Sequence, residues 1–182
     1  MKAIKHFVIA VFGLLSLISC NSDDEFYNAA YVSVPDLITI DTPASYSVGD
    51  NVSFHTDFSR YLPEDGFTDP LDIYKTSKAE SFGFAYRLEK ETAPDVWTSV
   101  FDNGDEFSVA EAVYQTATQT YKCDIATPLN SAGNYRLGFG ESYTGYQSTD
   151  LISRNPENET SVRITTNANN TNGQGYYYFT VN

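Results

Sequence analysis

The sequence is poor in basic residues, and this scarcity limits what the protein can bind. It carries 11 Lys and Arg against 24 Asp and Glu over 182 residues, which gives a formal net charge of −13. Nucleic acids and anionic phospholipid surfaces are bound through basic patches. The composition therefore argues against nucleic acid or anionic phospholipid as a partner, and it suits a protein that is exposed outside the cell or one that meets cations.

Residues that perform catalytic chemistry are scarce as well. The only histidines are His6 and His55, and the only cysteines are Cys20 and Cys123. A zinc site built from several histidines is excluded, and a Ser-His-Asp or Cys-His centre in the body of the chain would have to use His55. Alternating apolar residues around His55 place it on the solvent face of a strand. We expect no catalytic centre, no metal site and no cofactor.

Several motifs with a known mechanism are missing. The chain has no heptad pattern, no Gly-rich phosphate loop and no convincing internal repeat. The acidic turn Asp102-Asn103-Gly104-Asp105 lacks the glycine at position six and the distal glutamate of an EF-hand calcium loop. Its Asn-Gly pair favours a type I′ hairpin that joins strands at residues 96–101 and 106–109.

The first twenty residues form a recognisable targeting segment. Lys2 and Lys5 precede an apolar run over residues 7–17, and Ser19 supplies the small residue that a signal peptidase requires. The run is too short to span a bilayer. Because Cys20 follows Leu-Ile-Ser directly, the segment resembles the bacterial lipoprotein signal, in which the cysteine takes a diacylglycerol and becomes the new N-terminus. The resemblance implies lipidation of Cys20 and attachment to a membrane. A plain signal peptide with an accidental cysteine is the alternative.

The residues after Cys20 point to a location. Asn21-Ser22-Asp23-Asp24-Glu25 resembles the acidic tag behind the lipidated cysteine of Bacteroidota lipoproteins that reach the outer face of the outer membrane. This resemblance implies an outer-membrane protein that faces the cell surface; a solvated tether is the alternative. Loss of residues 1–19, which hold two basic residues and no acid, leaves 163 residues with a net charge of −15. We expect a signal peptide at 1–19, a lipidated tether at 20–29 and one domain at 30–182.

The composition of the domain is typical of strands and turns. Aromatic residues make up 15% of the chain, and polar positions are rich in Thr, Ser and Asn. With Cys20 lipidated, Cys123 has no disulfide partner, and its strand pattern predicts an inert buried thiol. Trp97 is expected in the core. Period-two alternation between turn signals predicts strands at residues 31–34, 37–40, 45–48, 51–58, 82–88, 96–101, 106–109, 120–125, 135–139, 161–166 and 176–181.

One stretch resembles a known fold family. Ser131-Ala132-Gly133-Asn134-Tyr135-Arg136-Leu137 is similar to the approach to strand F in immunoglobulin-like domains, where a tyrosine makes the corner hydrogen bond. Ser131 replaces the usual aspartate, and Leu137 replaces the cysteine of the inter-sheet disulfide. The resemblance implies an all-β fold, a single antiparallel Ig-like β-sandwich with two long loop insertions, and it implies no activity.

The two long insertions are the candidate binding loops. Residues 60–81, with a short helix expected within 69–78, and residues 141–160 interrupt the alternation, and in an Ig-like sandwich they would lie at the same end. Loops on a rigid sandwich often bind partners, although they can also simply cover sheet edges. The start of the first strand is expected at this end too, so these loops would face the membrane. The candidate residues are Tyr61, Phe67, Tyr74, Tyr143 and Tyr146.

Three functions stay open at this point. The first is a non-catalytic surface lipoprotein that serves as an accessory subunit of an outer-membrane complex for uptake, secretion or assembly, with a β-barrel protein as partner. The second is a glycan-binding lipoprotein of a polysaccharide-uptake system, in which Trp97, Tyr176 or Tyr178 would stack on sugar rings. The third is a hydrolase with paired carboxylates, although no acidic pair lies in a recognisable frame. We favour the first.

Overall fold

The computed structural model describes residues 28–101, 104–140 and 147–182. These ranges are all β apart from one short helix, and they contain no helix long and apolar enough to cross a membrane. The elements, in chain order, are β1 (Ala29–Ser33), β2 (Ile38–Ile40), β3 (Asn51–Ser59), β4 (Tyr61–Leu62), β5 (Leu71–Asp72), α2 (Ile73–Ser77), β6 (Ser81–Ala93), β7 (Val96–Ser99), β8 (Ser108–Gln115), β9 (Thr120–Pro128), β10 (Gly133–Phe139), β11 (Thr149–Arg154), β12 (Ser161–Thr166) and β13 (Tyr176–Val181).

Strand β6 is the centre of the main sheet. Its 13 residues span about 40 Å, long enough to pair with four other strands. The N-terminal half pairs with β8 on one side and β11 on the other, and the C-terminal half pairs with β10 and β7. From there the sheet runs through β8, β9 and β3 to β2 on one side, and through β11 and β12 to β1 on the other. β13 extends it beyond β10.

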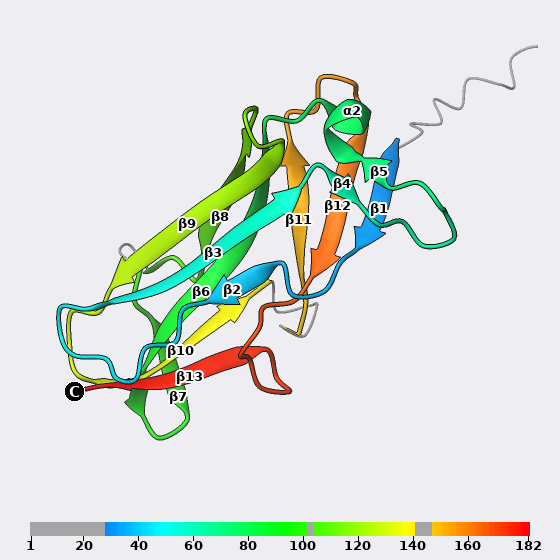
Figure 1. Cartoon of the computed structure of the whole chain (residues 1–182). Helices are drawn as coiled ribbons and strands as arrows, with labels where there is room; N and C mark the ends of the chain where they lie inside the picture. Colours follow the sequence, from blue (N-terminus) through cyan, green and yellow to red (C-terminus); the bar gives the residue numbers. More distant parts are fainter. Residues whose placement is uncertain (1–27, 102–103, 141–146) are drawn as a thin grey trace, which may run out of the picture.

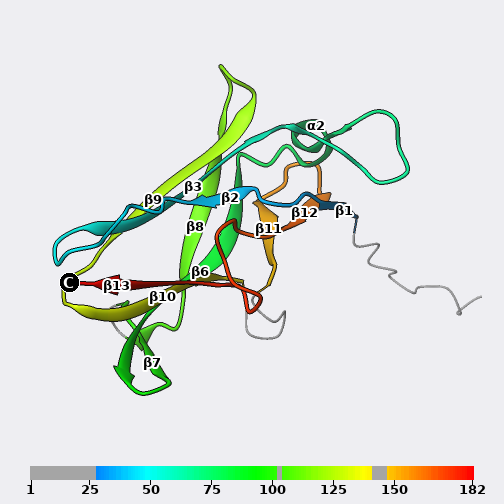
Figure 2. The same ribbon diagram turned by 60° about the horizontal axis from the view of Figure 1, so that its bottom comes forward.

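The sheet curls so that its two sides face each other. Ile38 of β2 forms a parallel bridge with Ala168, and Tyr46 forms one with Val181 of β13. Figure 2 shows β2, β3 and β9 as one layer above β10 and β13. The core lies between these layers, where Phe54 of β3 meets the rings of Tyr86 and Phe139 at centroid distances of 4.9 and 5.0 Å.

The sheet is mixed, so the expectation of a wholly antiparallel sheet is wrong. β1 pairs with β12 in parallel, with Ala29 opposite Ser161 and Ser33 opposite Thr165. Because β1 is the first strand of the domain and β12 comes late in the chain, no short turn between them imposes an antiparallel direction. The all-β prediction is confirmed, whereas a single antiparallel Ig-like sandwich is not.

The sequence pattern located most strands but missed three, the two-residue strands β4 and β5 in the 60–81 segment and β11. β12 and β13 have the predicted bounds, and α2 lies within residues 69–78. The segment 141–160, predicted to be a loop, instead contains β11, whose Leu151 is fully buried between neighbouring strands. β7 pairs with β6, so β7 and β8 do not form the hairpin predicted for Asn-Gly. Residues 45–48 form only the single bridge at Tyr46.

The predicted tyrosine corner is present. The hydroxyl of Tyr135, at the start of β10, donates to the backbone carbonyl of Ser131 at 2.8 Å. Lys90 donates to the Ser131 hydroxyl at 2.8 Å, which holds the corner against β6. The hydrogen bond that the seven-residue resemblance implied is therefore confirmed, although the cysteine position is occupied by Leu137, which is buried.

Candidate binding surfaces

The segment between β3 and β6 is anchored on Arg60. Its guanidinium makes a two-pronged ion pair with Asp72, with Nε 2.9 Å from Oδ1, and its Cζ lies 4.9 Å from the ring centroid of Tyr61. Asp72 also accepts from the backbone N–H of Lys75 and so caps α2. The hydrogen bond to Asp72 raises the pKa of the Arg60 guanidinium. These contacts fix the base of the insertion, which contains β4, β5 and α2.

The three described candidate residues of this insertion have different environments. Tyr74 stacks on Tyr114 at 4.3 Å and 15°, and its hydroxyl reaches Glu80 at 3.4 Å, so much of its ring is used in packing. Tyr61 is 44% exposed and Phe67 is 69% exposed. Phe67 lies in the loop between β4 and β5 and is the one that presents most apolar surface to solvent.

This insertion lies at the end of the molecule where the described chain begins. The side-chain amide of Asn158, in the turn between β11 and β12, donates to the carbonyls of Lys75 and Thr76 in α2. The same turn leads into Ser161, whose N–H donates to the carbonyl of Asn28 just before β1. Figures 1 and 2 both show α2, the β4–β5 loop and the start of β1 at one end, which we call the anchor end.

The other two candidate loop residues, Tyr143 and Tyr146, lie outside the described residues, as does Cys20. The described chain next to them resumes at Gln147, whose side chain donates to the carbonyl of Gly173 at 2.7 Å. Gln147 precedes β11, whereas Asn158 follows it, so these two contacts lie at opposite ends of that strand. The 60–81 insertion therefore meets residues 155–160 of the second predicted loop.

A second surface lies on the outer side of β6, β7, β10 and β13 and is centred on Arg136. The guanidinium carbon of Arg136 is 4.7 Å from the centroid of Trp97 and 4.3 Å from that of Tyr176. Nε of Arg136 donates to Glu89 at 2.7 Å. Tyr178 meets Trp97 edge-on at 5.5 Å and is 44% exposed. We call Trp97, Arg136, Tyr176 and Tyr178 the aromatic face.

The sequence pattern predicted Trp97 in the core, and this prediction is wrong. Trp97 lies on the four-residue strand β7, which pairs with β6, and it is half-buried by the side chains of the aromatic face. Position 138 is glycine because a Cβ there would lie 2.7 Å from the Tyr176 ring. The small residue lets the buried Tyr176 ring lie against β10, next to Arg136.

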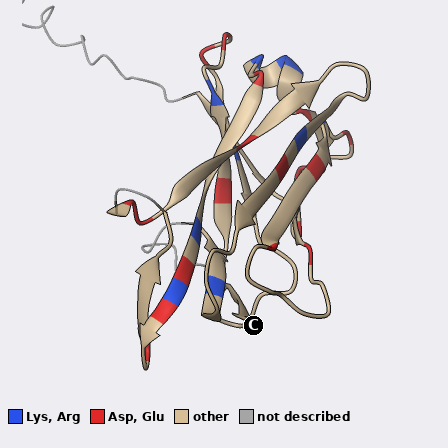
Figure 3. Cartoon of the chain, turned by 90° about the vertical axis from the view of Figure 1, so that its left-hand side faces the viewer, with Lys and Arg blue, Asp and Glu red and all other residues tan. Residues whose placement is uncertain are grey.

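Polar groups border the aromatic face. The side-chain amide of Asn134 donates to Glu91 at 2.8 Å, and its oxygen accepts from Thr180 at 3.0 Å. With Trp97 and Tyr178 these groups line a shallow depression of about 260 Å³. Figure 3 shows acidic and basic residues following one another along the β6–β7 hairpin at the bottom of the molecule.

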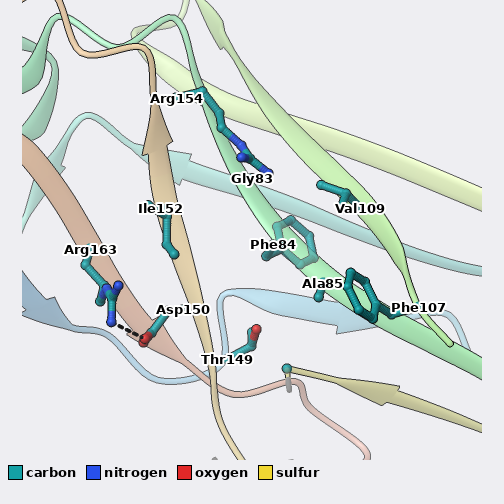
Figure 4. A pocket seen from close by; sticks show the side chains of 11 residues that line it. Gly83, Phe84, Ala85, Phe107, Val109, Thr149, Asp150, Ile152, Arg154 and Arg163 are labelled. Atoms are coloured by element: carbon teal, nitrogen blue, oxygen red, sulfur yellow. Dashed lines mark ion pairs between the residues drawn. The ribbon is translucent and has the colours of Figure 1, made fainter. Parts of the chain in front are cut away.

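A third surface is a groove on the outer side of β6, β8 and β11 (Figure 4). Gly83, Phe84 and Ala85 of β6 form its floor, while Val109 of β8 and Ile152 of β11 form its walls. Phe107 continues the first wall and is 43% exposed. The groove has a volume of about 260 Å³. It arises directly from the sequence, since small residues alternate with large buried ones along β6.

Two arginines border this groove. Arg163 pairs with Asp150, with Nη1 3.4 Å from Oδ2. Arg154 extends its guanidinium over the backbone of Gly83, where a Cβ would come within 2.7 Å of Cζ. No carboxylate of the described residues forms an ion pair with Arg154.

The remaining reactive groups are placed as follows. His55 on β3 has a 41% exposed side chain and lies 3.4 Å from Asp41, as expected for the solvent face. Cys123 is buried and unbridged, and burial raises the pKa of its thiol. Within the described ranges, no group of three or more His, Cys, Asp and Glu side chains is arranged to hold a metal ion.

Sequence reasoning missed Arg136 and Arg154 as surface-building residues. Each depends on a nearby glycine. Gly138, two residues after Arg136 on β10, leaves room for the Tyr176 ring, and Gly83 of β6 lies beneath Arg154 of β11. The available signal was a glycine inside a strand pattern, which often indicates a close approach by another group. The pattern does not say which residue approaches.

Comparison with known proteins does not assign a function to any of the three surfaces. No protein-family model, no curated protein and no solved structure matches this chain.

Proposed function

We propose that the protein is a non-catalytic lipoprotein of the outer membrane that faces the cell surface, and that it is an accessory subunit of a complex for uptake, secretion or assembly. A diacylglycerol on Cys20 would anchor it. Its partner would be an integral outer-membrane β-barrel protein, which the anchor end contacts.

One observation carries this proposal. The start of β1, the folded 60–81 insertion and the exposed side chains of Tyr61 and Phe67 lie at the same end of the domain. A tether over residues 20–29 reaches at most ~35 Å when fully extended. The aromatic side chains of the insertion would thus be held close to the membrane, next to any protein embedded there.

The chemistry of the anchor end favours a protein over bare lipid. Phe67 lies among Glu64, Asp65 and Asp69, which anionic headgroups would repel. An aromatic side chain with a charged rim is the usual composition of a protein–protein contact. The Arg60–Asp72 ion pair fixes the base of the insertion, so less conformational entropy is lost when a partner binds.

We also propose a finer description of the fold, an elaborated Ig-like sandwich. The order β2-β3-β9-β8 corresponds to Ig strands A-B-E-D, and β13-β10-β6-β7 corresponds to G-F-C-C′. The corner hydrogen bond of Tyr135 falls on the strand that corresponds to F. The departures are β11 and β12 between F and G, the parallel strand β1, and the pairing of β6 with β8 across the two layers.

The test is purification of the tagged lipoprotein from gently solubilised outer membranes, followed by mass spectrometry of the proteins that accompany it. We expect a stoichiometric β-barrel partner. The variant Phe67→Ser, alone or with Tyr61→Ser, should reduce its recovery several-fold. Val48→Ser is the matched control, because Val48 is 52% exposed and its N–H bonds to Asn182 at the C-terminal end of the chain.

Two outcomes would contradict the proposal. Recovery of the lipoprotein alone, including after chemical cross-linking in intact cells, would show that it has no stable β-barrel partner. Equal recovery of the partner with Phe67→Ser, Tyr61→Ser and Val48→Ser would move the contact away from the anchor end.

The aromatic face supports a second candidate function, glycan binding. Trp97 and Tyr178 offer half-exposed rings, and Glu91, Asn134 and Thr180 offer hydrogen-bond donors and acceptors beside them. Aromatic rings next to such polar groups suit a sugar, which has apolar C–H faces and equatorial hydroxyls. Binding on a glycan array that is lost in Trp97→Ala and retained in Phe67→Ser would favour this function.

A further inference from the structure

We propose that the groove between β8 and β11 binds a small amphipathic anion, a single carboxylate or phosphate that carries one short apolar chain. The anionic group would lie on Arg154, whose guanidinium covers Gly83, and the chain on Ala85, Val109 and Ile152. This site is independent of the proposed partner at the anchor end, because its residues belong to a different surface.

The floor and walls of the groove favour an apolar chain. The small side chain of Ala85 leaves space above the sheet, while Val109 and Ile152 line the groove on either side (Figure 4). Val109 is 49% exposed and Phe107 43%. Covering this surface with a ligand would remove apolar area from water. The volume of about 260 Å³ is slightly below the roughly 300–1,000 Å³ typical of ligand pockets, so the ligand is small.

Arg154 supplies the charge that selects an anion. Its guanidinium lies over the Gly83 backbone, where only a glycine leaves room for it. Among the described residues the other four arginines, Arg60, Arg87, Arg136 and Arg163, each have an acidic side chain within 4.0 Å. Arg154 has none. A guanidinium presents paired donors that match a carboxylate or a phosphate.

Two acidic side chains near the groove affect how tightly an anion should bind. Glu111 of β8 lies opposite Gly83, and its carboxylate accepts from the Ser81 hydroxyl at 3.1 Å. It would repel an anion bound to Arg154. The Asp150 carboxylate accepts a hydrogen bond from the Thr165 hydroxyl and pairs with Arg163. Neutralising Glu111 should therefore strengthen the binding of an anion, whereas it should leave an uncharged ligand unaffected.

The experiment uses four probes of equal chain length: hexanoate, hexyl phosphate, hexanol and hexylammonium. The protein is the mature chain, residues 20–182, with Cys20→Ser so that no acyl chain of its own competes. Backbone amide shifts of Gly83, Ala85 and Val109 are followed by NMR as each probe is added. We expect saturable shifts with an anion, about fivefold weaker binding of hexanol, and weaker binding still of hexylammonium. The tighter of the two anions identifies the headgroup.

Variants separate the charge from the groove. Arg154→Gln should weaken the anion about fivefold and leave hexanol unchanged. Gly83→Ala should displace Arg154 and weaken every probe, while Glu111→Gln should tighten the anion alone. Lys122→Gln, which removes a cation that pairs with Asp57 on β3, is the control for net charge. Thermal unfolding of each variant checks that it is folded.

The proposal is overturned if no probe shifts these amides, if hexanol binds as tightly as the anions, or if Lys122→Gln and Arg154→Gln weaken the anion equally. None of these results depends on the β-barrel partner, so this site and the proposed function can fail separately.

Discussion

Arg60 and Asp72 face each other across the base of the 60–81 insertion and are joined by two hydrogen bonds, one of them 2.9 Å from Nε to Oδ1. Their side chains are only 18% and 19% exposed. The same Asp72 carboxylate accepts from the N–H of Lys75 at the start of α2. A single side chain thus closes the β4–β5 hairpin and caps the helix that follows it.

Loss of this carboxylate should destabilise the domain. Asp72→Ala removes the helix cap and leaves Arg60 partly buried without its partner, which should lower the free energy of unfolding by about 2–3 kcal/mol. The midpoint of thermal unfolding should fall by roughly 5–10 °C. Asp57→Ala is the control, because Asp57 pairs with Lys122 at a surface site and its removal should cost less than about 1 kcal/mol. Equal losses for both variants would contradict this role.

Acid should weaken the same contact. Burial alone would raise the pKa of Asp72, but its hydrogen bonds with Arg60 and Lys75 outweigh burial and hold that pKa below the ordinary 3.8. The stabilisation is therefore complete above pH 3.8 and is lost as the pH falls below this value through the folded pKa. Urea unfolding between pH 6 and pH 2 should show a smaller acid-dependent loss in Asp72→Asn than in the wild type.

The tyrosine corner makes a separate prediction. Tyr135→Phe removes the donor to the Ser131 carbonyl without changing the packing of the ring, so the free energy of unfolding should fall by about 1–2 kcal/mol. Tyr31→Phe is the control, since Tyr31 is 69% exposed on β1. Urea unfolding measures both. A loss that does not exceed that of Tyr31→Phe would show that the corner hydrogen bond contributes little.

The strands that sequence analysis located well are those with one buried face. In β3, Val52, Phe54 and Phe58 are buried and His55 is on the solvent side, as alternation predicts. β11 was missed because residues 141–160 contain Gly and Pro and only a short alternation, with Leu151 and Ser153 inward. Its position depends on pairing with β6 and β12, which are distant in sequence, and no local pattern reveals such pairs.

The candidate surfaces depend on side chains that meet across strands, and this is why only part of them could be predicted. Phe67 was found because it stands in a loop with turn residues on both sides. Trp97 was assigned to the core because large aromatic residues are usually buried. Its actual neighbours are Arg136 and Tyr178, which become adjacent only when β7, β6, β10 and β13 pair in the observed register.

One buried hydroxyl offers a way to stabilise the domain. Thr56 in β3 is 2% exposed, and its Oγ1 has no hydrogen-bond partner among the described residues. Thr56→Val replaces this hydroxyl by a methyl group of similar shape, so we expect a gain of up to about 1 kcal/mol in unfolding free energy. Thr166→Val is the matched control. Thr166 is equally buried, but its Oγ1 accepts from the N–H of Leu37 at 3.0 Å, and its loss should destabilise. Measured destabilisation by Thr56→Val would indicate a bound water or another partner.

The proposed lipid anchor can be tested with the two cysteines of the chain. Cys20→Ala removes the thiol that would carry the diacylglycerol, so labelled palmitate should no longer be incorporated and the protein should leave the outer-membrane fraction. Cys123→Ala is the matched control. It removes a thiol on β9 that is buried, and burial raises the pKa of that thiol. Both the label and the membrane location should therefore be kept. Measuring the label separates loss of lipid from retention through an uncleaved signal segment. Continued incorporation of palmitate into Cys20→Ala would refute lipidation at this residue, and with it the proposed short tether that would hold the anchor end near a membrane partner.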